Sequence, residues 1–234
     1  CAAQPLRARA ANVTSIEILR DYFDGRIIFP SSCSVYGINS GVATEKTKTR
    51  PLSLYAEMKL EAEEILQEKN ALILRLGTLH GVTDRLRSDL VVNTFAIRAL
   101  TEKKIPVFGG KQYRPFIHVY DVARVMWQQA LSGHPTLAVR GIYNLVAENI
   151  SIRDIANFIA KDIDCEVVVS KMPSEDKRNY RVCAGRAQKD LGFNPEYSIS
   201  DTVARFKALH EQGRIKNYFN PRYSNILSLE GGKE

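Results

Sequence analysis

The stretch PLSLYAEMKL, from Pro51 to Leu60, contains a tyrosine four residues before a lysine. On a helix, Tyr55 and Lys59 lie one turn apart on the same face. An ammonium beside a phenol favours the phenolate, so such a pair can act as an acid–base device. Chance also produces this spacing easily in a chain with 10 tyrosines. A solvated surface pair is therefore the alternative, and the surrounding sequence must decide between the two.

The strand pattern before this helix supplies a third candidate for chemistry. Arg26–Ser31 (RIIFPS) is short and apolar, and it runs directly into Ser32, Cys33 and Ser34. Ligands of a doubly wound sheet bind beyond the carboxyl ends of its strands. We therefore expect Ser32, Tyr55 and Lys59 to converge on one cleft at that edge. The alternative for Ser32 is a strand-terminal hydroxyl that only bonds to the backbone.

The elements that must position these residues alternate along the chain. The alternation predicts an α/β fold with a partial doubly wound, largely parallel sheet and a smaller C-terminal α/β part. The tail from about Asn217 has no clear period and is expected to wrap or trail over the surface. Helices are expected over Asn12–Phe23, Leu54–Lys69, about Leu90–Leu100, from Asp121, from Ser151 to about Ile163, and from Ser200 or Asp201; strands are expected over Arg26–Ser31, Ala71–Leu76, Ile105–Phe108, Pro115–Val119, Ile142–Val146 and Val167–Ser170.

Composition limits the classes of function. Hydrophobic residues make up 44% and charged residues 25% of the 234 residues, as in ordinary globular proteins. No apolar run approaches the roughly 18 residues of a membrane span, and no signal peptide opens the chain. The cysteines lack metal-ligand spacing, so we expect reduced thiols in a cytoplasmic protein without a metal site or a membrane partner. They are Cys1, Cys33, Cys165 and Cys183.

The net charge of +7 suggests an anionic partner, but not nucleic acid. The basic residues are spread along the chain among the acids, and no basic run exceeds two residues. A nucleic-acid surface would gather them on one stripe or patch. An anionic small-molecule substrate fits the same charge.

Four segments in this order resemble the extended short-chain dehydrogenase/reductase family, in its nucleotide-sugar epimerase/dehydratase branch (UDP-glucose 4-epimerase-like). They are FPSSCSVYG, YAEMK, RLGTLHG and PVFGGKQYRPFIHVYDVA. The resemblance extends to about Phe193 and implies NAD or NADP as cofactor, a nucleotide-sugar substrate, a homodimer and a Rossmann-like fold. Residues 1–80 would form the C-terminal half of the dinucleotide-binding domain. Residues 81–234 would mainly bind substrate, with segments near 114–132 returning to the Rossmann-like sheet.

The resemblance also implies residue roles. Tyr55 would be the general acid/base, Lys59 would lower its pKa and bind the nicotinamide ribose, and Ser32 would complete the catalytic set. Further cofactor contacts are implied for Ser31, Leu76 and Thr78, and substrate contacts for Ser34, Asn93, Arg114 and Arg178.

The two arginines are expected to face a common anion site, because a guanidinium fork matches two phosphate oxygens. For Arg178, and for its less secure neighbour Arg181, a plain surface arginine is an equally good interpretation. His118, on an apolar strand, is expected to be a packed and satisfied histidine, and Trp127 is expected to lie in the core.

Three departures from the family pattern limit the function. No G-x-x-G-x-x-G turn for the cofactor pyrophosphate occurs among the 14 glycines, so the N-terminal half of the dinucleotide domain is missing from this sequence. Thr78 replaces an asparagine common in the family. Cys33 and Ser34 stand where the dehydratase subgroup has Asp and Glu, so we expect epimerisation rather than dehydration. Ketoreduction, or a non-catalytic module that binds sugar nucleotides, is the alternative.

Overall fold

The structure is a computed structural model that describes residues 4–131, 139–170, 178–214, 220 and 223–224. Contacts divide the chain into two units. Unit 1 comprises Cys1–Gly77, Val122–Ala147 and Arg178–Asn194; unit 2 comprises Thr78–Asp121, Glu148–Lys177 and Pro195–Glu234. Most of the tail from Asn217, whose course the sequence left open, lies outside the described residues.

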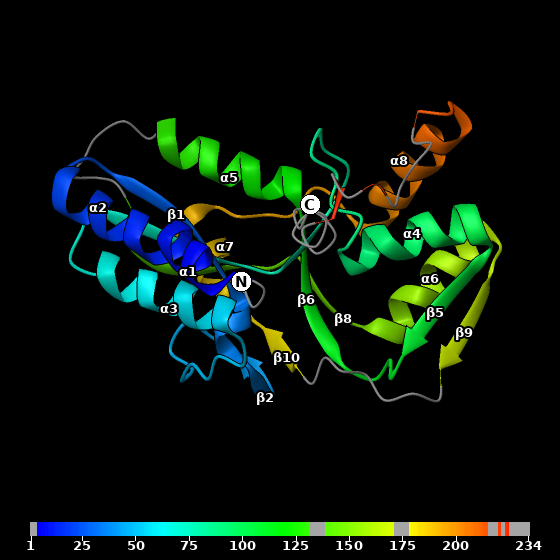
Figure 1. The fold of residues 1–234 in the computed structure, drawn as a ribbon, viewed down its shortest axis with the longest axis horizontal. Helices are drawn as coiled ribbons and strands as arrows, with labels where there is room; N and C mark the ends of the chain where they lie inside the picture. Colours follow the sequence, from blue (N-terminus) through cyan, green and yellow to red (C-terminus); the bar gives the residue numbers. More distant parts are fainter. Residues whose placement is uncertain (1–3, 132–138, 171–177, 215–219, 221–222, 225–234) are drawn as a thin grey trace. The chain divides into compact units, whose positions relative to one another are not determined.

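The sheet of unit 1 has the order β1-β3-β7 and is parallel throughout. Its strands are β1 (Ile27–Ser32), β3 (Ala71–Leu76) and β7 (Gly141–Leu145). Helices α2 (Ser15–Tyr22) and α3 (Leu54–Leu66) pack on one face. Helix α5 (Val119–Leu131) lies on the other side of the strands (Figure 1). Unit 1 thus has the layered α/β arrangement that the sequence predicts.

Apolar side chains at alternate strand positions explain this packing. Ile27 and Phe29 of β1 and Ile73 of β3 are buried against α2 and α3, as the two-residue period of a strand requires. Smaller elements complete unit 1: α1 (Pro5–Arg9), a π-helical turn (Ala10–Thr14), a 3₁₀ turn (Cys33–Tyr36), the parallel pair β2 (Ile38–Ala43) and β10 (Asn179–Val182), and α7 (Gly185–Leu191).

The described residues of unit 2 form two small sheets and three helices. Strands β4 (Thr78–His80) and β6 (Tyr113–His118) are parallel, and β8 (Glu148–Ser151) joins β6 antiparallel. The second sheet pairs β5 (Lys104–Phe108) with β9 (Glu166–Ser170). The helices α4 (Val91–Glu102), α6 (Ile152–Ile163) and α8 (Ile199–Glu211) share one hydrophobic core with β5.

The structure corrects the expected starts of two helices and the expected burial of one side chain. The helix expected from Asp121 begins at Val119. The last helix begins at Ile199, because Ser198 and Asp201 form a capping box. Trp127 is 65% exposed, so its placement in the core was wrong. It lies two residues beyond the buried Val125, which puts it on the opposite face of α5.

The strands β2, β4, β8 and β10 were not expected. Each has six residues or fewer, and β2 has the exposure pattern of a surface strand. Strands β4, β8 and β10, with three or four residues each, are too short for a pattern to identify them, and the mostly exposed β2 lacks an apolar run. No described helix has the length and apolarity needed to span a bilayer.

Candidate functional site

Helix α3 presents Tyr55 and Lys59 on one face, as their spacing predicts. The hydroxyl of Ser53 accepts a hydrogen bond from the Ala56 N–H at 3.2 Å and so sets where the helix begins. The Lys59 ammonium donates to the Pro30 carbonyl of β1 at 2.9 Å. It also lies 5.9 Å from the centroid of the Tyr55 ring. The helix is therefore held against the carboxyl end of β1 by the lysine itself.

The two side chains have different access to solvent. Tyr55 is 39% exposed, whereas Lys59 is half-buried and its Nζ also lies 4.6 Å from the Phe29 ring centroid. Burial lowers the pKa of Lys59, and the nearby Glu63 carboxylate acts in the opposite direction. A partly desolvated cation beside an accessible phenol is an arrangement suited to proton transfer.

The serines at the end of β1 form a compact hydroxyl pair. Ser32 caps the 3₁₀ turn, because its Oγ accepts from the Ser34 N–H at 3.2 Å. The Ser32 and Ser34 hydroxyls lie 2.9 Å apart, and either can be the donor. The hydrogen bond between the two hydroxyls uses one hydroxyl proton. The proton of the other hydroxyl can therefore be donated to a ligand. Ser32 thus has a structural role as the cap of the 3₁₀ turn, and the pair still has one hydroxyl proton for a ligand.

Ser31 and Cys33 point into the interior. Ser31 is 3% exposed and donates its hydroxyl proton to Glu63. Cys33 is 1% exposed, and its thiol donates to the Arg75 carbonyl at 3.2 Å. Burial raises the pKa of the Cys33 thiol, so it stays protonated. A buried neutral thiol therefore occupies the position of the dehydratase subgroup's aspartate.

Two predicted cofactor contacts lie near the carboxyl end of β3. Leu76 is half-buried and is in register with Ser32 of β1 and Leu145 of β7. Thr78, also half-buried, begins β4 and belongs to unit 2. The contact that each is expected to make stays a prediction.

The predicted substrate contacts are divided between the units. Arg114 is buried on β6 in unit 2 and donates to the Tyr113 carbonyl at 2.9 Å. Arg178 is half-buried just before β10 in unit 1. Their shared anion site stays a prediction.

The side-chain amide of Asn93 is engaged inside unit 2. Its Nδ2 donates to the carbonyls of Gly81 and Arg87, and its Oδ1 accepts from the Gly81 N–H. These bonds brace the loop before α4 and use both amide protons. Asn93 therefore has a structural role that explains its burial without a ligand.

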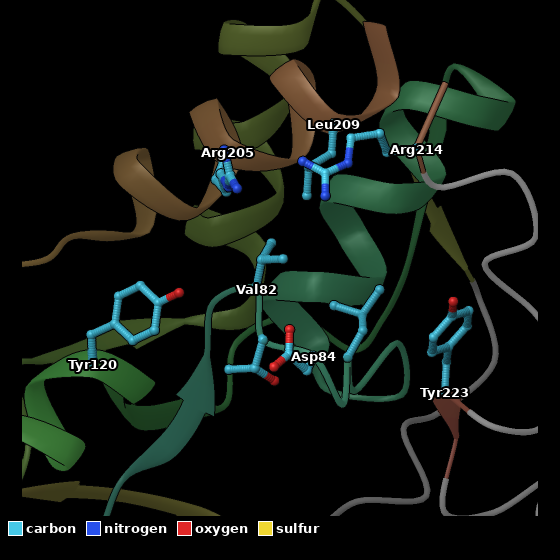
Figure 2. A pocket seen from close by; sticks show the side chains of 9 residues that line it. Val82, Asp84, Tyr120, Arg205, Leu209, Arg214 and Tyr223 are labelled. Carbon is cyan, nitrogen blue, oxygen red and sulfur yellow. The ribbon is translucent and has the colours of Figure 1, made fainter. Parts of the chain in front are cut away.

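Unit 2 also has a pocket that the sequence did not indicate. Its volume is about 390 Å³, and Arg205 and Arg214 lie on one side of it, with Asp84 on the other (Figure 2). None of the side chains predicted to do chemistry lines it. The lining residues are Val82, Thr83, Asp84, Leu86, Tyr120, Arg205, Leu209, Arg214 and Tyr223.

Histidines and cysteines form no metal site in the described part of the chain. There, no group of three or more His, Cys, Asp or Glu side chains could hold an ion. Cys33, Cys165 and Cys183 are free thiols. His118 is buried, and its Nδ1 accepts from the Tyr120 N–H at 3.1 Å. This confirms the expectation of a packed and satisfied histidine.

Sequence reasoning missed one buried group beneath the hydroxyl pair. Glu63 of α3 and Arg75 of β3 form an ion pair with a 2.6 Å contact, and both side chains are almost fully buried. Two signals were available: Glu63 lies one turn after Lys59, and Arg75 interrupts the apolar strand ALILRL. A charge inside an apolar strand indicates a buried partner.

Comparisons with known proteins agree with this architecture. Curated relatives include a UDP-glucose epimerase of Bacillus subtilis (strain 168), YtcB, described as uncharacterized. It is 26% identical over 196 residues, which cover 80% of this chain and 60% of the relative. The beta subunit of methionine adenosyltransferase 2 from Bos taurus is 30% identical over 120 residues, or 50% of this chain and 36% of that protein. The matched part of the chain therefore spans less than two thirds of the length of each of these relatives.

Solved structures are similar over most of the chain. MoeE5 in complex with UDP-glucose and NAD is 25% identical with a TM-score of 0.72, covering 87% of this chain and 72% of that one. A UDP-glucuronic acid 4-epimerase from Bacillus cereus, 23% identical with a TM-score of 0.73, has the same fold over 87% of this chain and 68% of its own. The model of the NAD dependent epimerase/dehydratase family matches residues 9–145, more than half of the sequence. The chain belongs to the NAD-dependent epimerase/dehydratase family.

Proposed function

We propose that this chain carries the acid–base centre of an NAD-dependent nucleotide-sugar epimerase. The observation that carries the proposal is the placement of Lys59, bonded to the end of β1 and beside the accessible Tyr55. Relatives described as UDP-sugar epimerases support a nucleotide-sugar substrate. Activity, substrate and a homodimeric state are proposals for the whole protein.

Each residue of the centre has one task. Tyr55, as phenolate, takes the proton from a sugar hydroxyl while hydride leaves the same carbon, and later returns the proton. Lys59 stabilises the phenolate by its charge. A free phenol has a pKa near 10. To act as a base near neutrality, the phenol must have its pKa lowered by about three units, which corresponds to roughly 4 kcal/mol of stabilisation of the phenolate. The hydroxyl of the Ser32–Ser34 pair whose proton is not used within the pair can donate a hydrogen bond to the sugar oxygen that gains negative charge.

The residues present fit the nicotinamide end of the cofactor. Lys59 retains two ammonium protons beyond its bond to Pro30, and Tyr55 is accessible on the same helix face. The glycine-rich turn that would hold the pyrophosphate is not part of this sequence. When bound, NAD supplies the acceptor that takes hydride from the sugar and returns it.

Epimerisation is favoured over dehydration by the environment of Cys33. Loss of water from a keto sugar needs an acid for the leaving hydroxyl and a base for the neighbouring carbon proton. The Cys33 thiol is buried, bonded to a carbonyl and held protonated by its raised pKa. Ser34 is neutral and is bonded to Ser32. Neither can take the role of a carboxylate, whereas epimerisation or ketoreduction needs only Tyr55 and hydride transfer.

Incubation of the protein with NAD and UDP-glucose tests the proposal. We expect an isomer of equal mass, resolved by chromatography and mass spectrometry. The Tyr55→Phe variant should lose about 10²-fold or more in kcat. Tyr22→Phe is the matched control, because Tyr22 is 86% exposed on α2 of the same unit. A product lighter by one water would refute epimerisation, and full activity of Y55F would remove Tyr55 from the centre.

A non-catalytic module is the second candidate. One similar protein is named as a subunit of methionine adenosyltransferase 2, which supports an assembly role for some relatives. This candidate predicts that the protein binds a UDP-sugar but neither binds NAD nor turns the sugar over. Calorimetric titrations with each ligand separate the two candidates.

A further inference from the structure

A row of buried polar side chains crosses the sheet of unit 1 just below the hydroxyl pair. Ser31 of β1 is opposite Arg75 of β3, and Arg75 is opposite Asn144 of β7. The three residues are 3%, 3% and 0% exposed. The row lies one position before Ser32, so it supports the end of the sheet where the proposed chemistry occurs.

Glu63 closes this row from helix α3. Its carboxylate accepts from Arg75 Nε at 3.0 Å and Arg75 Nη2 at 2.6 Å, and it also accepts the Ser31 proton. Arg75 Nη1 donates to the Tyr36 hydroxyl at 2.9 Å, and that hydroxyl donates to Asn144 Oδ1 at 2.8 Å. One carboxylate therefore joins α3 to two strands, and the network continues to the third.

Two adjacent contacts hold α3 to the end of β1. Lys59 donates to the Pro30 carbonyl, and one turn later Glu63 accepts from Ser31, the next residue of the strand. We propose that Glu63 is a positioning residue, which fixes α3 on β1 and provides a negative charge that favours the ammonium form of Lys59 beside Tyr55. This inference rests on the proposed role of Lys59.

The charges around Lys59 support an electrostatic effect of Glu63. Burial lowers the pKa of Lys59, and among charged groups the Glu63 carboxylate raises it. Strand β1 has no titratable side chain. Several other titratable groups of the packed elements have partners of their own: Arg75 with Glu63, Tyr36 with Arg75 and Asn144, Cys33 with the Arg75 carbonyl, Arg9 with Glu61, and Arg20 with Asp21.

The test is the apparent pKa of the Lys59 amine in the 234-residue chain, measured by competitive acetylation and mass spectrometry across a pH series. The Glu63→Gln variant removes the charge but keeps an amide oxygen for Ser31. We expect the pKa of Lys59 to fall by about one unit. Glu64→Gln is the matched control, because Glu64 is exposed on the same helix, and it should leave the pKa within the error of the wild type. A purely structural Glu63 would change stability but not this pKa.

A double variant covers the case in which E63Q does not fold, since that change leaves the Arg75 charge buried without its partner. Glu63→Gln combined with Arg75→Gln removes both charges, and a smaller fall in the Lys59 pKa than in E63Q is expected, because loss of the Arg75 cation partly offsets loss of the carboxylate. An unchanged pKa in either folded variant overturns the proposal. The measurement needs neither NAD nor a sugar nucleotide. A shifted pKa in a protein without epimerase activity would therefore support the positioning role and refute only the proposed function.

Discussion

Two tyrosines of unit 1, Tyr36 and Tyr55, lie in opposite environments. Tyr36 is 1% exposed, and burial raises its pKa to about 12 despite its bond to Arg75. Tyr55 is 39% exposed beside the Lys59 ammonium. The first tyrosine remains a neutral hydrogen-bonding group, and the second has the access that proton transfer to a ligand requires. Environment, rather than residue type, separates the structural phenol from the candidate catalyst.

Gly37, directly after the 3₁₀ turn, is predicted to tolerate no side chain. Its φ is +65°, and an added Cβ would lie 1.9 Å from the Arg50 carbonyl oxygen. Gly37→Ala should lower the free energy of unfolding by about 3 kcal/mol or more, because strained backbone alone costs roughly 1–3 kcal/mol. Gly41→Ala is the control, since its Cβ would meet only Asn39 Oδ1 at 3.8 Å. Equal urea midpoints for the two variants would contradict the prediction.

Arg114 is predicted to bind the phosphates of the sugar nucleotide. Arg114→Ala should weaken UDP-glucose binding by about 1.5–3 kcal/mol, the scale of a charge-assisted hydrogen bond. The matched change is Arg98→Ala on α4, where the arginine forms a partly exposed ion pair with Glu102. Calorimetry measures both affinities. If R114A binds as tightly as R98A and the wild type, Arg114 is not part of the site.

At the scale of elements, caps decide where the functional helices begin. Ser53 fixes α3, so that Tyr55 falls in the first turn and Lys59 and Glu63 follow at successive turns of one face. Ser151 caps α6 by accepting from the Asp154 N–H at 3.1 Å. Ser198 and Asp201 exchange bonds at the start of α8. The same local chemistry therefore sets the helix register in both units.

The capping box of α8 gives a prediction for unit 2. Ser198→Ala should lower the free energy of unfolding by about 1 kcal/mol, because it leaves the Asp201 N–H without its partner. Ser200→Ala serves as control, since Ser200 is exposed within the same helix and should change stability by less than about 0.5 kcal/mol. Chemical denaturation monitored by circular dichroism compares the two. A smaller loss in S198A than in S200A would exclude the box as a stabilising feature.

At the scale of the whole molecule, each unit contains its own buried polar group. Unit 1 has the satisfied Ser31–Arg75–Asn144 row. Unit 2 has His80, whose Nδ1 lies 2.8 Å from the Thr202 hydroxyl and whose Nε2 has no hydrogen-bond partner among the described residues. Burial, followed by the neighbouring His118, lowers the pKa of His80 to about 3. Protonation of the His80 ring therefore destabilises the folded state.

Acid is predicted to destabilise the protein through His80. The unfolded histidine titrates near pH 6.5, so the unfolded state binds the extra proton between pH 6.5 and about 3. Stability from this group is complete above pH 6.5 and is lost as the pH falls toward 3. Relative to His80→Gln, the wild type should lose about 3 kcal/mol between pH 7 and pH 4. Urea unfolding at several pH values measures the difference, and parallel curves would contradict the role of His80.

The family, the alternation of strands and helices, and the common face of Tyr55 and Lys59 can all be predicted from the sequence. These follow from motif order and from periods of two and 3.6 residues, which are local properties. Three features become visible only in the folded chain: Glu63 pairs with Arg75, the Asn93 amide is bonded to the loop before α4, and Trp127 is exposed. The row Ser31–Arg75–Asn144 joins positions far apart in the chain, because strand order and register bring them together. No local pattern contains that information, since a contact between distant segments depends on how the whole chain packs.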